Sequence, residues 1–99
     1  MVQYLDRAFA ALADPTRRAI VERLGSGSAS ISELAQPFGI SLTGTRKHVL
    51  VLEGAGLVVT EKVGRSRRCT LAPYAFEGVT AWLQRLDRFA AVVERTKGR

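Results

Sequence analysis

Two short segments with helical apolar spacing, separated by a glycine-containing turn, constrain the fold of this chain most. The first segment, residues 32–38, is kept brief by Pro37, because proline removes a backbone donor beyond the first helical turn. The turn contains Gly39, and Ser41 is a suitable N-cap for a second helix predicted over residues 42–55. Two helices joined in this way are typical of a helix-turn-helix.

Two further helices are predicted before this unit. Apolar spacing favours one over residues 4–13. Asp14 followed by Pro15 is a strong start signal for the next, which is expected to end near Leu24 with Asp14 as its N-cap. Residues 26–30 are interpreted as a linker of small residues, and Ser32 is predicted to cap the third helix.

After Gly56 the pattern changes from helical to extended. Strands are predicted over 57–63 and 68–71, joined by a turn over 64–67, and a last helix is predicted from Pro73 to about Arg95. The whole chain, residues 1–99, is therefore predicted to be one domain that is mainly α with a small β-hairpin. This is a winged helix-turn-helix with about five helices and a two-stranded wing.

The charge distribution favours a polyanionic partner. The chain has 15 basic and 9 acidic residues, a net charge of +6, and residues 58–72 alone contribute +3. A solvated turn is the alternative interpretation of the basic cluster Arg65–Arg68. Its place directly after a helix-turn-helix favours contact with the phosphates or minor groove of duplex DNA.

The predicted helix over 42–55 has two distinct faces. Thr43, Lys47, Leu50 and Gly54 point outward, where a recognition helix would enter the major groove. Gly44, Arg46 and Val51 lie on the flanks. The inward face is predicted to consist of Leu42, Thr45, Val49, Leu52 and Gly56.

Four stretches of the sequence jointly resemble the ArsR/SmtB family of winged-helix repressors. They are Ala13-Asp14-Pro15-Thr16-Arg17-Arg18, Ile31-Ser32-Glu33-Leu34-Ala35, Lys47-His48-Val49-Leu50-Val51-Leu52-Glu53 and Ala55-Gly56-Leu57-Val58. The resemblance implies a homodimer, held by the first and last helices, that binds pseudo-palindromic operators in double-stranded DNA and blocks transcription. The predicted DNA-binding residues are Ser41, Thr43, Gly44, Arg46, Lys47, Lys62, Arg65, Arg67 and Arg68.

Three positions depart from the family pattern. Arg46 stands where the family commonly has serine, and Leu50 stands where a basic residue is frequent. Gly44 lies inside the recognition helix at a cost of ~1 kcal/mol relative to alanine. Close approach of the backbone to DNA is one reason for a glycine here. The operator sequence therefore does not carry over from the family.

The last predicted helix has an apolar stripe from Val79 to Val93 that exceeds the needs of one small core. We expect part of it to pack against a second subunit. The predicted dimer interface is Leu5, Phe9, Trp82, Leu83, Leu86, Phe89 and Val93, with ordinary core positions as the alternative for Trp82 and Phe89.

No metal site and no cofactor are predicted. The family's cysteine pair near the third helix would fall on Ser30 and Ser32, whose hydroxyls are poor ligands for soft metals, and the last predicted helix has no histidine. His48 is interpreted as a packed structural residue rather than a pH sensor or ligand. Cys69 is interpreted as an inert strand residue rather than an oxidant sensor.

Features that the sequence lacks argue against several other classes of function. No nucleophile–base pair or phosphate loop favours an enzyme, and no apolar run suits a membrane span or signal peptide, so a cytoplasmic protein is expected. Two alternatives stay open. One is a family member that releases DNA on binding a metal or small molecule. The other is a winged helix used for protein–protein contact, which the outward Leu50 and Val51 would suit.

Overall fold

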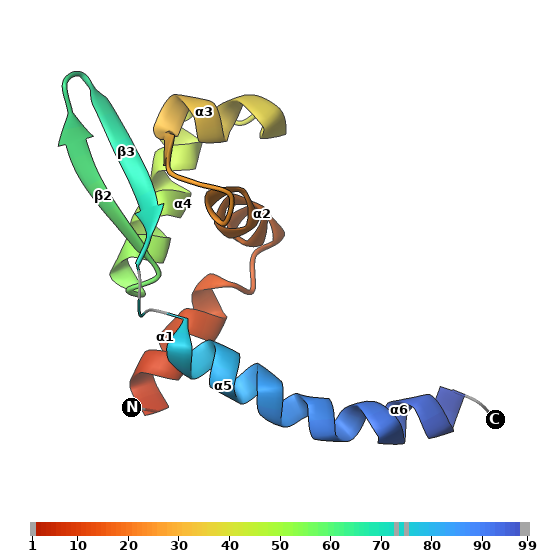
Figure 1. Ribbon diagram of the computed structural model, residues 1–99. Helices are drawn as coiled ribbons and strands as arrows, with labels where there is room; N and C mark the ends of the chain where they lie inside the picture. The colour runs from red at the N-terminus through yellow and green to blue at the C-terminus, as the bar shows by residue number, and fades with distance from the viewer. Residues whose placement is uncertain (1, 73, 75, 98–99) are drawn as a thin grey trace.

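The computed structural model describes residues 2–72, 74 and 76–97. Within them, a small antiparallel sheet lies at one side of a group of helices, and a helical arm extends away from this body (Figure 1). In chain order the elements are α1 (Val2–Ala11), α2 (Pro15–Leu24), β1 (Ala29–Ser30), α3 (Ile31–Ala35), η1 (Gln36–Phe38), α4 (Leu42–Gly54), β2 (Val58–Val63), β3 (Ser66–Leu71), α5 (Glu77–Leu86), η2 (Asp87–Phe89) and α6 (Ala90–Lys97). The predicted mainly α fold with a β-hairpin is confirmed.

The start of α2 confirms the prediction from the Asp-Pro pair. The Asp14 side chain accepts a hydrogen bond from the backbone N–H of Arg17 at 3.0 Å, and Pro15 occupies the first helical position. The helix ends at Leu24 with Gly25 as its C-cap. Because both ends carry strong local signals, α2 matches its predicted bounds.

The cap of α3 was predicted at the wrong serine. Ser30, not Ser32, is the N-cap: its hydroxyl accepts from the Glu33 N–H at 3.1 Å, and its own N–H donates to the Glu33 carboxylate at 2.9 Å. This reciprocal capping box requires a glutamate or glutamine three positions after the cap. Ser32 has Ala35 at that position, so it cannot form the box.

The sheet has a third strand that the sequence did not reveal. Its order is β1-β3-β2, with Ala29 opposite Cys69 and Ser30 opposite Arg68. The predicted linker thus ends in a two-residue strand. The hairpin turn is also tighter than predicted: Val63 pairs with Ser66, which leaves only two loop residues. Gly64 has φ 62° and Arg65 does not have positive φ, which matches a type II′ turn.

The core is formed by α1, α2, α3, α4, the sheet and the start of α5. On α4, Thr45, Val49 and Leu52 are buried as predicted. Leu42 and Gly56, which were placed on the same face, are exposed instead. Gly56 lies beyond the helix with φ 79°, and Leu42 is the first helical residue, so neither continues the inward stripe.

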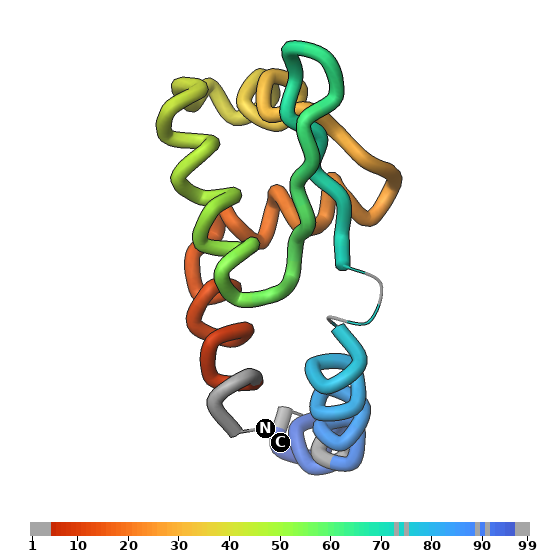
Figure 2. Tube along the Cα trace, turned by 90° about the vertical axis from the view of Figure 1, so that its left-hand side faces the viewer, coloured from red at the N-terminus to blue at the C-terminus, as the bar shows by residue number. Residues whose placement is uncertain are grey.

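The predicted C-terminal helix is interrupted. Helices α5 and α6 flank the 3₁₀ segment η2, and this arm lies at the opposite end of the molecule from the hairpin tip (Figures 1 and 2). Its first residues lie beside α1. Pro73, the predicted start of the helix, is outside the described residues. The longest dimension of the molecule is 55 Å because of this arm.

Candidate nucleic-acid interface

The first turn of α4 is fixed by two local hydrogen bonds. The Ser41 hydroxyl accepts from the Gly44 N–H at 3.0 Å, and the Thr45 hydroxyl donates to the Ser41 carbonyl at 2.9 Å. A Cβ on Gly44 would lie 3.1 Å from both Ile40 Cγ2 and Ser41 Oγ. Glycine at position 44 therefore has a packing reason of its own, beside the close approach to DNA considered from the sequence.

The hairpin is anchored to the helix-turn-helix at two points. At its base, Glu53 of α4 accepts hydrogen bonds from the Thr60 N–H at 3.3 Å and the Thr60 hydroxyl at 2.8 Å. On β3, the Arg68 guanidinium lies 3.7 Å from the Glu33 carboxylate of α3 and donates to Ser28 Oγ at 3.3 Å. These contacts fix how the hairpin stands relative to α4.

Four basic side chains surround one surface hollow of about 250 Å³. Arg46 comes from α4, and Lys62, Arg65 and Arg67 come from the hairpin, with Ser66 completing the lining. Lys62 and Arg67 are also directly opposite each other across the two strands. Like charges in that register repel each other, so the arrangement costs stability unless an anion lies between or above them.

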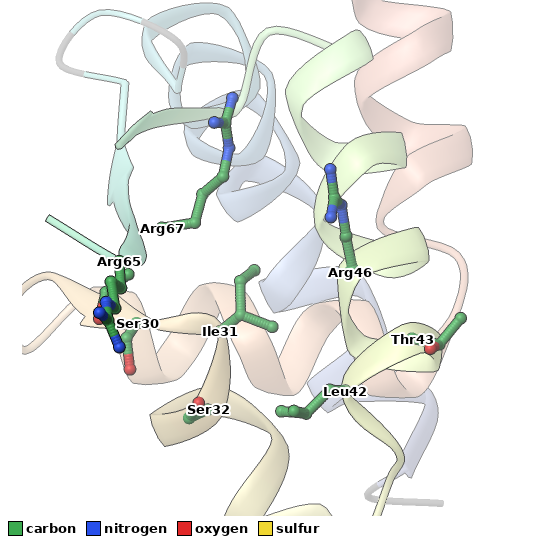
Figure 3. Close-up of a pocket in the computed structure, with 9 residues that line it drawn as sticks. Ser30, Ile31, Ser32, Leu42, Thr43, Arg46, Arg65 and Arg67 are labelled. Carbon is green, nitrogen blue, oxygen red and sulfur yellow. The ribbon is translucent and has the colours of Figure 1, made fainter. Parts of the chain in front are cut away.

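A second hollow, of about 290 Å³, continues this surface toward α3. Its lining residues are Ser30, Ile31, Ser32, Leu42, Thr43, Arg46, Arg65, Ser66 and Arg67. Figure 3 shows Arg46 on one wall, Arg65 and Arg67 on the hairpin side, and Ile31 and Leu42 between them. The start of α4 and the hairpin thus form one continuous surface that is basic at its walls and apolar at its centre.

The structure brings together only part of the predicted DNA-binding set. Thr43, Arg46, Arg65 and Arg67 line the second hollow, and Lys62 joins the first. Lys47 is exposed on α4 but lines neither hollow. Ser41 and Gly44 form the helix cap. Arg68 is turned toward Glu33 and Ser28.

Five residues of this surface were not in the predicted DNA-binding set. Ser30, Ile31, Ser32, Leu42 and Ser66 line the hollow beside Thr43 and the basic residues. Helical spacing placed Leu42 on the inward face of α4. Its position as the first residue after the Ser41 cap was the only signal for an exposed side chain. For Ser66, the overlong predicted turn concealed its pairing with Val63.

A polar cluster behind α4 connects it to the start of α2. Arg17 Nε donates to the Ala11 carbonyl at 2.7 Å, and its Nη1 lies 3.4 Å from His48 Nδ1. His48 Nδ1 is also 4.0 Å from the Asp14 carboxylate. The hydrogen bond from the Arg17 N–H, with help from the nearby Arg17 and His48 charges, lowers the pKa of Asp14. The half-buried His48 is thus a packed, hydrogen-bonded residue, as interpreted from the sequence.

Cys69 lies fully buried in the middle of β3. Burial raises the pKa of its thiol, which disfavours the reactive thiolate. Among the residues that the structure describes, no three His, Cys, Asp or Glu side chains are grouped as metal ligands would be.

Comparison with known proteins decides the family. A helix-turn-helix domain model matches residues 12–61. The HTH-type transcriptional regulator Rv2034 of Mycobacterium tuberculosis is 44% identical over 84 residues, which cover 85% of this chain and 76% of that protein. The crystal structure of the ArsR family transcriptional regulator RHA00566 is 43% identical, covers 89% of this chain and 97% of that one, and has a TM-score of 0.77. The chain belongs to the ArsR family. It is a DNA-binding transcriptional regulator.

A more distant ArsR-like structure shares the fold. The winged helix-turn-helix DNA-binding domain Mb0332 of Mycobacterium bovis, described as homodimeric, is 23% identical with a TM-score of 0.74 and covers 89% of this chain and 82% of that one. The similar proteins of this family are regulators rather than enzymes. Within the described part of this ArsR-family chain, no helix has the length and apolar character to cross a membrane.

Proposed function

We propose that the chain is a homodimeric repressor that recognises a pseudo-palindromic operator and needs no metal to bind it. The main support for DNA binding is the surface hollow that Arg46 of α4 lines together with Lys62, Arg65 and Arg67 of the hairpin. Basic side chains from a recognition helix and from a wing, held in one place, match the major-groove edge and the neighbouring phosphates. Ser41, Thr43, Gly44, Lys47 and Arg68 complete the proposed contact set.

Dimerisation is proposed through α1 and the C-terminal arm. Five large apolar side chains on the arm are between 40% and 51% exposed: Trp82, Leu83, Leu86, Val92 and Val93. Leu5 and Phe9 are partly buried against the core, and their helix α1 packs against α5. The side chain of Phe89, also in the predicted interface, lies outside the described residues. The Mb0332 domain, which has the same fold, is homodimeric, and this supports a dimer for this chain as well.

Repression of transcription and independence from metal are proposed on separate grounds. Repression follows from the family resemblance, since a dimer seated on its promoter blocks polymerase. Metal independence is supported by Ser30, whose hydroxyl and N–H are both engaged with Glu33 in the α3 capping box. It is supported also by the burial of Cys69.

Fluorescence anisotropy with the promoter region of the chain's own gene tests sequence-specific binding. We expect tight binding that survives an excess of unrelated competitor duplex. Binding that is lost equally to any competitor would contradict a specific operator.

Isothermal titration with zinc, copper and arsenite tests metal independence: we expect no heat of binding and no release of DNA, whereas release by one of these ions would establish an inducer-gated regulator.

Charge removal tests the role of the hairpin. The double variant Arg65→Gln/Arg67→Gln should weaken binding to all duplexes and reduce the slope of log K against log salt by about 0.9 for each lost phosphate contact. The matched control is Arg85→Gln/Arg88→Gln, which removes the same charge from the arm. An equal slope change in both variants would show that only net charge matters.

A protein–protein role is the second candidate, favoured by Leu50 and Val51, which are 53% and 45% exposed on α4. Size-exclusion chromatography with and without operator DNA separates the two functions. We expect the protein to co-elute with DNA, and failure to do so would favour the protein partner.

A further inference from the structure

Leu42 is an exposed apolar residue on a surface that, apart from Ile31, is basic and polar. It is the first residue of α4, directly after the Ser41 cap, and is 57% exposed, the most of the three exposed apolar side chains on that helix. Arg46, Arg65 and Arg67 line the same hollow. The Leu42 side chain contacts water rather than the core, so burial does not explain why the residue at this position is apolar.

The fold does not explain a leucine at this position. The inward face of α4 is supplied by Thr45, Val49 and Leu52, all of which are buried. The cap hydrogen bond comes from the Ser41 side chain and does not involve Leu42. The first position of a helix accepts polar residues at little cost. A polar side chain here would therefore fold equally well and would be better solvated.

The chemistry of the major groove supplies the missing partner. Thymine is the DNA base that shows a methyl group there, and apolar side chains are its natural contact. The residues at the N-terminal end of a recognition helix are those that reach base edges. Arg46, one helical turn after Leu42 and on the same side of the helix, can bind the O6 and N7 atoms of guanine.

We propose that Leu42 determines operator specificity by contacting the C5-methyl group of a thymine close to the guanine read by Arg46. This inference rests on the proposed DNA-binding function and adds to it one base in each half-site. Ile31, half-buried in the same hollow, extends the apolar surface on which the methyl group lies.

Replacement of thymine by deoxyuridine tests the contact, because it removes the methyl group and keeps the base pair. A binding site is first selected from a random duplex library with the wild-type chain. Each thymine of that site is then replaced in turn, and dissociation constants are measured for the wild type, Leu42→Ala and Leu50→Ala. Leu50 is the matched control: it is an equally exposed leucine on α4 that lies outside both hollows.

We expect one thymine per half-site whose replacement weakens wild-type binding about fourfold, the value of one buried methyl group. Leu50→Ala should show the same loss, and Leu42→Ala should show none. Equal melting temperatures of the three proteins exclude misfolding. Uracil tolerated at every position, or an unchanged loss in Leu42→Ala, would overturn the proposal. Failure of the wild type to select any sequence would instead contradict the proposed operator binding.

Discussion

Asp14 combines two roles in a single carboxylate. It caps α2 through the Arg17 N–H, and it faces His48 of the recognition helix at 4.0 Å. Because its folded pKa is lowered below the ordinary value of 3.8, the ionised carboxylate stabilises the folded chain. That contribution is complete above about pH 4 and is lost as the pH falls through the lowered pKa.

We therefore predict that Asp14→Ala lowers the melting temperature by several degrees at pH 7, and that the gap from the wild type narrows below pH 4. Thermal unfolding followed by circular dichroism across this pH range measures both curves. Glu22→Ala is the control, since Glu22 is an exposed carboxylate on the same helix. Parallel curves at all pH values would show that the carboxylate charge of Asp14 does not stabilise the fold.

Cys69 is predicted to react only when the chain opens. Its side chain is 0% exposed and burial raises the pKa of its thiol, so both access and thiolate formation are suppressed. A chromogenic disulfide reagent should modify the native protein slower than the denatured protein by a factor on the order of 10³ or more. Rapid modification of the native protein, with loss of DNA binding, would instead make Cys69 an oxidant sensor.

At the scale of elements, predictability from sequence followed the strength of the local signal. Helix α2 was predicted to the residue because Asp14, Pro15 and Gly25 mark both of its ends. The extent of α4 was right within one residue for a similar reason. In contrast, β1 has only two residues, and its pairing with Cys69 and Arg68 depends on a strand some 40 positions away. No local pattern encodes such a contact.

The candidate site was predictable by residue type and less so by geometry. Arginines at 46, 65 and 67 were expected at DNA, and the structure gathers them round one surface. Tertiary contacts decide which of the basic residues also pair within the protein, as Arg68 does with Glu33. Helical periodicity placed Leu42 on the inward face of α4. Periodicity does not show that the first turn of the helix projects beyond the core, where Leu42 is exposed.

The capping box of α3 gives a prediction that discriminates the two serines. Ser30→Ala should destabilise the chain by ~1 kcal/mol, which is a fall in melting temperature of about 4–8 °C for a domain of this size. Ser32→Ala should leave stability within about 0.5 kcal/mol of the wild type. Thermal or urea unfolding measures both. Equal losses, or a larger loss for Ser32→Ala, would contradict the observed cap.

At the scale of the molecule, the arm and the hairpin have separate tasks. The body is closed by its own core, whereas the arm carries large apolar side chains at 40–51% exposure along α5 and α6. An isolated chain gains little by holding such an apolar helix away from its body. A second copy that covers the arm would bury this stripe. It would also place two recognition helices on one duplex, where half-sites lie about one helical turn apart.

Leu83→Glu, which puts a charge into the exposed stripe of α5, is therefore predicted to yield a monomer in size-exclusion chromatography with light scattering. Each monomer would then bind its half-site alone. Affinity for a two-half-site operator should fall by about 10²–10⁴, because the second contact is no longer intramolecular, while affinity for a single half-site should change little. Gln84→Glu adds the same charge one residue further along and should remain dimeric. A Leu83→Glu protein that is still dimeric, or a wild type that is already monomeric, would show that the arm of α5 and α6 does not hold two subunits together.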